Sequence, residues 1–171
     1  MEFWKCFFYF ALTGVLAFFV GRLIPKDWLH ADGFLFRCRS FEQEGKLYEK
    51  LNIKQWQNRL PDMSRILPFL MPPKKLSGDY KQRLPLMIEE TCVAELIHIL
   101  VCITGLYSLQ LWPGMGGITV YLLYVVFFNL PYILIQRYNR PRLMKLYRKT
   151  QHGSSSDLNS FSNPDIQPHY H

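Results

Sequence analysis

Charge is scarce in three long stretches of this 171-residue chain, and their composition sets the fold class. Residues 118–135 carry no charged side chain, residues 92–111 carry only the carboxylate of Glu95, and residues 3–24 are charged only at Lys5 and Arg22. Each stretch is about as long as the roughly 17–25 apolar residues that cross a bilayer as a helix. We therefore predict an all-α membrane protein with about three transmembrane helices, near 3–24, 92–111 and 118–135, the last two forming a hairpin.

Several chemical signatures are also missing. The four cysteines form no C-x-x-C pair, which disfavours a zinc site or a disulfide framework. One Glu-x-x-His is present, at 95–98, whereas a di-iron bundle needs two copies with further carboxylates. A nucleophile elbow, an H-x-x-x-x-D box, a Walker loop and a dinucleotide fingerprint are absent. We expect no metal and no cofactor, and the sequence indicates no oligomeric state.

Positive charge is abundant, and its distribution predicts the topology. Twenty Lys and Arg against 13 Asp and Glu give a net charge of +7. Because the basic residues flank the apolar stretches, we expect a membrane and an anionic ligand as partners, and no nucleic acid. The turn at 112–117 has no Lys or Arg, so the loop at 25–90 and the C-terminus are predicted to be cytoplasmic and the N-terminus to lie outside. A cleaved signal peptide is the alternative for the first span; Glu2 before it disfavours this.

The remaining segments complete the domain plan. Residues 1–150 are predicted to form one membrane domain, with interfacial helices in the loop at 25–90. Residues 40–51 are predicted to be a helix capped by Ser40, residues 53–60 to place Trp56 at headgroup level, and residues 63–70 to dip into the interface between proline breakers. The Ser-, Asn-, Pro- and His-rich stretch 151–171 is predicted to be a disordered tail.

Glu95 and His98 are the strongest candidates for chemistry. They are three residues apart, and Thr91 precedes Glu95 by four, so all three share a helical face. An ionisable side chain inside an apolar span costs roughly 2.5–3.5 kcal/mol on insertion scales, which favours a functional role. His98 would act as a general base that Glu95 orients. The alternative is that the two fasten their helix to its neighbours through Asn129 or Arg137.

A second cluster follows the third span. Arg137, Arg140 and Arg142 surround Asn139 and Pro141, which is predicted to stop the helix. Flanking charge for topology explains arginines in general, but it does not require this pattern. The planar guanidinium suits phosphate or carboxylate. The antiparallel hairpin would bring this cluster opposite residues 90–98.

Two strings carry a family resemblance. M-I-E-E-T-C-V-A-E-L-I-H at 87–98 and N-L-P-Y-I-L-I-Q-R-Y-N-R-P-R-L at 129–143 resemble the glycosyl-4,4′-diaponeurosporenoate acyltransferase family of staphyloxanthin-type carotenoid biosynthesis. Ile99 stands where the family has tryptophan. The resemblance implies transfer of a fatty acyl group from an acyl-CoA-type donor to the C6 hydroxyl of glucose on a glycosylated C30 carotenoid acid.

The resemblance and the residues together give a candidate site. His98 and Glu95 are the candidate catalytic residues. The arginines would hold donor phosphates and Asn139 would donate to the oxyanion. The full set of candidate substrate-binding residues is Arg137, Asn139, Arg140, Arg142, Glu90 and Thr91. An acyltransferase acting on another glycolipid, and a non-enzymatic membrane subunit or lipid-binding scaffold, are the alternatives.

Overall fold

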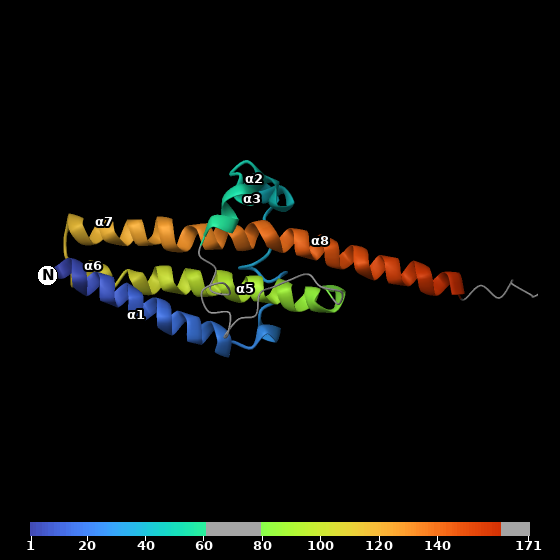
Figure 1. Ribbon diagram of the computed structural model, residues 1–171, viewed down its shortest axis with the longest axis horizontal. Coiled ribbons are helices and arrows are strands. Elements are labelled where there is room, and N and C mark those ends of the chain that lie inside the picture. The colour runs from blue at the N-terminus through green and yellow to red at the C-terminus, as the bar shows by residue number, and fades with distance from the viewer. Residues whose placement is uncertain (61–79, 162–171) are drawn as a thin grey trace, which may run out of the picture.

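Three long helices lie side by side in the computed structural model, which describes residues 1–60 and 80–161 (Figure 1). They are α1 (Glu2–Leu23), α5 (Tyr80–Gly105) and the continuous rod of α7 (Met115–Tyr124), a π-helical turn (Val125–Asn129) and α8 (Leu130–Phe161). Candidate membrane spans are Glu2–Leu23, Lys81–Leu111 and Met115–Gln151, so the described part of the chain has the predicted all-α architecture with three helices able to cross a bilayer.

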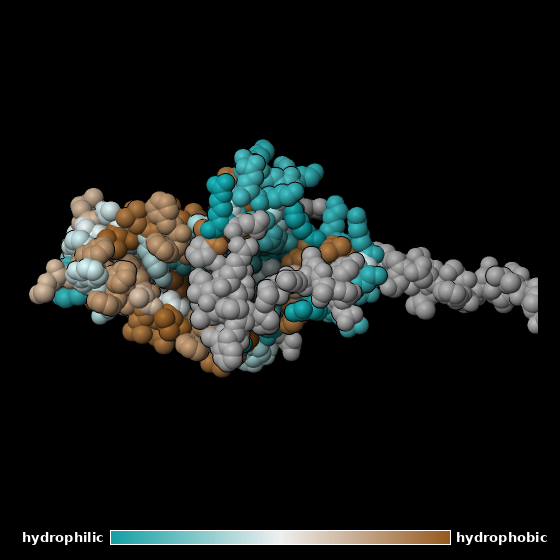
Figure 2. Space-filling view, in the orientation of Figure 1, coloured by the Kyte–Doolittle hydropathy of each residue, from teal (hydrophilic) through white to brown (hydrophobic). Residues whose placement is uncertain are grey.

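The helix α1 presents most of its surface outward. Its 22 residues extend about 33 Å at 1.5 Å per residue, enough for the hydrocarbon core. Only Cys6 and Phe10 are buried, and the helix ends at Ile24, which takes an extended conformation before Pro25. Apolar surface gathers over this half of the molecule, while polar surface gathers over the loop segments and the far part of α8 (Figure 2). This division fits a helix bundle that is embedded at one end.

A tight turn joins α5 to α7 through the short helix α6 (Ser108–Leu111). Gly114 has φ of +100°, and a Cβ on Gly117 would lie 2.0 Å from the carbonyl oxygen of Trp112. Only glycine fits both positions, because one needs a left-handed backbone and the other allows no side chain. The turn therefore runs α7 antiparallel to α5, as the predicted hairpin requires.

The rod continues through two prolines. Pro131 cannot offer an N–H to the carbonyl four residues before it, and the π-helical turn of Val125–Asn129 directly precedes it. Pro141 lies inside α8, so the prediction that it stops the helix is wrong. An internal proline costs roughly 3 kcal/mol, and the tertiary bonds of Arg137 and Arg140 described below hold α8 in place around it.

The loop is made of short pieces, namely two 3-10 turns (Lys26–Trp28 and Ser40–Gly45), α2 (Lys46–Glu49), α3 (Ile53–Trp56) and a third 3-10 turn (Gln57–Arg59). The first turn packs against α5, and Ser40–Gly45, α2 and α3 pack against α8. The single helix predicted at 40–51 is wrong because Gly45, at φ +91°, divides it. Arg39 rather than Ser40 precedes the first turn, and Glu42 accepts its backbone N–H at 2.6 Å. Tyr48 and Ile53 form a small core with Tyr138.

Two predictions concern residues beyond this description. The segment predicted to dip into the interface, 63–70, lies outside the described residues. The helix α8 runs to Phe161, into the stretch 151–171 that the sequence predicts to be a tail, and 162–171 lie outside the described residues.

Candidate functional site

Glu95 is the centre of a buried ion network between α5 and α8. Its side chain has no exposed surface. Arg137 donates from Nε to one carboxylate oxygen at 2.7 Å, and Arg140 donates from Nη2 to the other at 2.5 Å. The two arginines are three apart on α8 and so share a face. The sequence analysis predicted that the cluster at 137–142 lies opposite residues 90–98, and Arg137 and Arg140 of that cluster meet Glu95 across the hairpin.

Arg140, on α8, is held by groups from two other segments, α5 and the loop. Besides Glu95, it donates to the hydroxyl and the carbonyl oxygen of Thr91, at 2.9 and 3.0 Å, and to the carbonyl oxygen of Phe36 at 2.7 Å. Its guanidinium also lies over the Phe36 ring, 5.3 Å from the centroid. Only 2% of its surface is exposed. Arg140 therefore joins α5, α8 and the loop, and its donors are already occupied.

Arg137 extends the network to the loop. Its Nη1 donates to Glu42 at 2.8 Å and its Nη2 to the carbonyl oxygen of Leu35 at 2.8 Å. Glu42 also accepts a hydrogen bond from the hydroxyl of Tyr48. The sequence analysis did not identify Glu42. The only signal was its place in an acidic first turn, which an exposed helix would also show.

Burial and hydrogen bonding act in opposite directions on Glu42. Burial alone raises the pKa of this carboxyl group, but hydrogen bonds from Tyr48, from the Arg39 backbone and from Arg137 lower it below its ordinary value. Burial, and next the bond to Glu42, raise the pKa of Tyr48, which stays protonated and able to donate. Two carboxylates and two guanidiniums thus alternate as Glu42, Arg137, Glu95 and Arg140, and their charges cancel.

His98 is bound to Asn129. Its Nδ1 lies 3.1 Å from Oδ1 of Asn129, whose Nδ2 donates to the carbonyl oxygen of Tyr124 at 3.2 Å. Because that second bond fixes the amide, the oxygen must face the ring, so neutral His98 carries its proton on Nδ1. Tyr132 stacks on the imidazole at 4.8 Å between centroids. The lone pair of Nε2 is then the basic position.

The partners of Glu95 and His98 differ from the predicted pairing. Glu95 binds the two arginines, and His98 binds Asn129, so the orientation that was expected from Glu95 comes from Asn129. These contacts match the alternative in which the two residues fasten α5 to its neighbours through Arg137 and Asn129. The sequence analysis named Asn129 as a fastener and not as the residue that orients His98; the π-helical turn places it toward α5.

The network lies level with the end of α1. Gly21 packs against Val93 and Ile97, and a Cβ there would approach Ile97 to 3.2 Å. Glu95 lies between these two residues in sequence, and α1 ends at Leu23. His98 is one turn deeper, about 5 Å at 1.5 Å per residue. The site is therefore close to the boundary where the apolar surface of α1 stops.

The other predicted site residues lie elsewhere. Glu90 pairs with Lys26 at 2.8 Å, next to the end of α1. Arg142 lies over the Tyr138 ring and pairs with Glu49 at 2.5 Å. Asn139 and Arg142 line a groove against α2 and α3, away from the face that carries Arg137 and Arg140. The structure thus groups Thr91, Glu95, Arg137 and Arg140, and separates Asn139, Arg142 and Glu90 from them.

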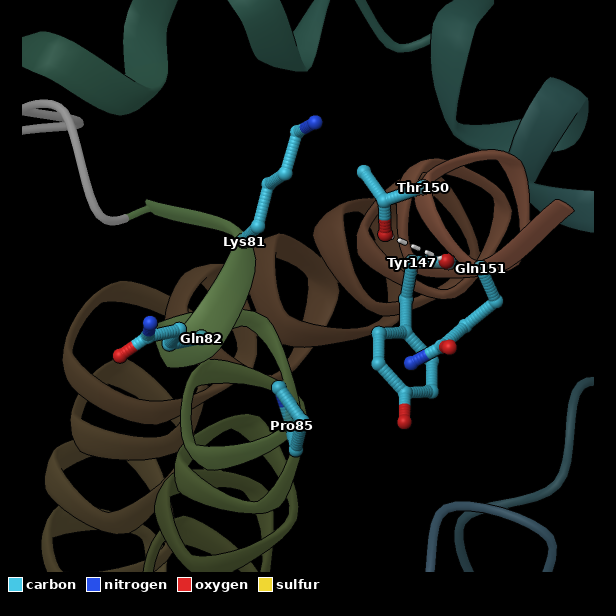
Figure 3. Close-up of a pocket in the computed structure, with 6 residues that line it drawn as sticks. All are labelled: Lys81, Gln82, Pro85, Tyr147, Thr150 and Gln151. Atoms are coloured by element: carbon cyan, nitrogen blue, oxygen red, sulfur yellow. Dashed lines mark hydrogen bonds between the residues drawn. The ribbon is translucent and has the colours of Figure 1, made fainter. Parts of the chain in front are cut away.

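A smaller cavity of about 240 Å³ lies between the start of α5 and the distal part of α8 (Figure 3). Its lining includes Pro85, which is about 15 Å from Glu95 along α5 at 1.5 Å per residue. It has no part in the network. Within residues 1–60 and 80–161, no three His, Cys, Asp or Glu side chains come together as metal ligands would.

The fold and the site define a class: a three-helix protein of membrane-spanning length, with a buried ion network and an oriented histidine near one boundary. The model of the glycosyl-4,4′-diaponeurosporenoate acyltransferase family matches residues 25–149. The chain belongs to this family, and the enzyme class that the family name gives is acyltransferase.

Named relatives agree with this membership. Glycosyl-4,4′-diaponeurosporenoate acyltransferases of Staphylococcus aureus strains bovine RF122 / ET3-1, USA300 and NCTC 8325 are each 27% identical over 144 residues. The match covers 84% of this chain and 86% of each relative. No solved structure matches the chain.

Proposed function

We propose that the protein is an integral membrane acyltransferase that esterifies a fatty acyl group onto the C6 hydroxyl of glucose on a glycosylated C30 carotenoid acid. Family membership and the relatives named for this acceptor support the reaction class. The observation that carries the proposal is the His98–Asn129 pair, with its basic Nε2, close to the boundary marked by the end of α1. The sugar headgroup of an amphiphile lies at this boundary when its apolar part is in the bilayer.

The membrane arrangement is part of the proposal. In the proposed arrangement the N-terminus lies outside, and the loop and the C-terminus lie in the cytoplasm, where acyl-CoA-type donors occur; the Lys and Arg residues of the loop and of the C-terminal segment favour this orientation. Cys38 tests this, because it is exposed in the loop while Cys6 and Cys92 are buried in the spans. An impermeant maleimide should label Cys38 in inside-out vesicles and leave it unlabelled in right-side-out vesicles. The reverse pattern would overturn the orientation.

The chemistry runs through His98. Nε2 takes the proton of the sugar hydroxyl as its oxygen attacks the acyl carbonyl of a thioester donor. The carbon–oxygen bond of the ester forms, the carbon–sulfur bond breaks, and the imidazolium returns the proton to the leaving thiolate. Asn129 accepts from Nδ1–H and so keeps the basic nitrogen pointing away from itself. No cofactor takes part in this sequence.

Glu95 and the two arginines take a positioning role in this proposal. All the ionic groups of the network are paired, and breaking a buried pair costs several kcal/mol, about 3–5 in measured cases. They fix α5 against α8, and with it the place of His98 relative to Asn129 and Tyr132. Thr91 contributes by holding Arg140. We do not assign donor phosphates to Arg137 or Arg140, because every nitrogen of both guanidiniums already donates to an oxygen of the protein.

Ester formation by the purified protein tests the proposal. The protein in nanodiscs receives palmitoyl-CoA and either the glucosylated C30 carotenoid acid or monoglucosyl diacylglycerol. The product should be the carotenoid glucoside increased by one acyl group, with the ester at C6 by NMR. If only monoglucosyl diacylglycerol is acylated, the acceptor is another glycolipid and not the carotenoid glucoside. Absence of any ester, with either acceptor, would favour a non-enzymatic subunit.

A further inference from the structure

A polar groove of about 550 Å³ runs between α8 and the short helices of the loop. It lies on a different face of α8 from the ion network. Its walls come from α2 and α3 with the turn after each on one side, and from α8 on the other. The lining residues are Glu49, Asn52, Lys54, Gln55, Gln57, Tyr138, Asn139 and Arg142.

Most of the polar side chains in this groove have no hydrogen-bond partner within residues 1–60 and 80–161. Among the described residues, the structure records no side-chain hydrogen bond for the four carboxamides of the lining or for Lys54. By contrast, Arg142 donates to Glu49 and to the carbonyl oxygen of Tyr138, and its guanidinium is 3.5 Å from the Tyr138 ring centroid. The open hydrogen-bonding groups are therefore mainly the amides of Asn52, Gln55, Gln57 and Asn139.

This composition selects a class of ligand. A carboxamide donates and accepts at once, as a hydroxyl group does, so a set of amides suits a polyhydroxyl group. The Glu49–Arg142 pair cancels its own charge, which leaves Lys54 as the one cation of the lining without an ionic partner among the described residues. A ligand with several phosphates would need more positive charge than this.

One lining residue of the groove, Tyr138, also belongs to the small apolar core. Trp56, Leu134 and Ile135 pack against that core. Further along the rod, Phe127 and Phe128 are 62% and 64% exposed. Asn139 precedes Arg140, which is level with Thr91, so the groove lies about 6 Å beyond the level of Glu95 at 1.5 Å per residue. A polar group there and a chain along α8 describe an amphiphile with its head at the membrane surface.

We propose that the groove of α2, α3 and α8 binds the uncharged polyhydroxyl headgroup of a membrane lipid, a sugar or a glycerol, with the lipid chain along α8. This goes beyond the proposed reaction, because Asn139 lies about 10 Å further along the rod than Tyr132, which stacks on His98. The headgroup in the groove is therefore not the one that reacts at His98. A free polyol and a lipid headgroup share this chemistry, and the exposed Phe127 and Phe128 further along the rod favour the lipid.

Native mass spectrometry of the full chain, released from a sugar-free detergent, tests the site. Equal amounts of monoglucosyl diacylglycerol, phosphatidylglycerol and diacylglycerol are offered together. We expect retention of the glucosyl lipid at least fivefold above both diacylglycerol and phosphatidylglycerol, whose phosphate is charged, and preferential retention of phosphatidylglycerol would contradict an uncharged headgroup. Equal retention of all three would overturn the proposal.

Variants locate the site. Gln55→Ala with Asn139→Ala should remove most of the headgroup selectivity, whereas Gln110→Ala, an exposed amide near the opposite end of the bundle, should leave it unchanged. Unchanged selectivity in the double variant, with circular dichroism like that of the parent, would contradict the assignment. His98→Ala should keep the selectivity. If His98→Ala loses ester formation and keeps its lipid selectivity, the result bears on the proposed reaction and leaves the headgroup site intact.

Discussion

Asn129 faces His98 across the hairpin, with its amide oxygen 3.1 Å from Nδ1 of the imidazole. The amide cannot turn freely, because its nitrogen donates to the carbonyl oxygen of Tyr124. A neutral amide thus performs the task that a carboxylate performs in many His-based sites: it selects one tautomer and aims the other nitrogen. The nearby carboxylate of Glu95 is used to join the helices instead.

Replacing Asn129 by Ala should lower kcat while KM changes little. The imidazole would lose the bond that fixes its tautomer, and positioned proton transfer contributes typically 10²–10⁴-fold, so we expect a fall of about tenfold or more. Asn129→Asp keeps an oxygen at the same place and should stay within about threefold of the parent. Equal kcat for the parent and Asn129→Ala would contradict this role.

Glu95→Ala should destabilise the fold strongly. It leaves the buried guanidinium of Arg140 without its anion, and removal of one partner from a buried pair costs about 3–5 kcal/mol. Glu49→Ala is the matched control, because its side chain is 58% exposed and surface pairs contribute roughly 0–1 kcal/mol. Unfolding in detergent, followed by intrinsic fluorescence, measures both. Similar losses for the two variants would show that the network is not the structural centre.

Glu42 should make stability depend on pH in the acid range. Because its folded pKa is lowered, its contribution is present above the unfolded value, near 4.5, and is lost as pH falls through the folded pKa. Glu42→Gln should therefore melt at a lower temperature than the parent at pH 6, with a difference that narrows below pH 4. Melting curves between pH 3 and pH 6 give this comparison. A difference that widens toward acid pH would reverse the assigned sign.

Gly45 should resist substitution for a conformational reason. Its φ is +91°, yet a Cβ there meets nothing closer than 3.6 Å, so Gly45→Ala adds strain and little steric conflict. The left-handed backbone costs an L-residue roughly 1–2 kcal/mol. Gly14→Ala, in open space within α1, should be neutral or stabilising by up to about 1 kcal/mol. Chemical denaturation of both variants tests the difference, and a neutral Gly45→Ala would contradict it.

The helical architecture was predictable because long runs without charge are visible in the sequence. The fold of the loop was not, because it depends on the conformation and contacts of single residues. Runs without charge identified the three spans, and the glycine-rich turn identified the hairpin. The helix expected at 40–51 fails at Gly45, where a single left-handed residue outweighs the spacing of Leu47 and Leu51. Pro141 was expected to end α8, but tertiary bonds on both sides of it hold the helix together.

The sequence predicted residues that take part in the candidate site, but it did not predict which of them bind one another. Thr91 and Glu95 face Arg140 as the antiparallel hairpin suggested. The sequence could not show that Glu42, from the loop, completes the network, because its burial depends on how short segments fold over α8. The same holds for Asn129, whose direction depends on a π-helical turn that follows from Pro131 and the packing of the rod.

Single-turnover ester formation by His98→Ala, in nanodiscs with saturating donor and acceptor, tests the central claim most directly. His30→Ala, an exposed histidine in the loop, is the control. The account predicts that His98→Ala stays folded and in the membrane and forms ester at least about a hundredfold more slowly than the parent, while His30→Ala matches the parent. Ester formation by His98→Ala at the rate of the parent would contradict the claim that this imidazole removes the hydroxyl proton.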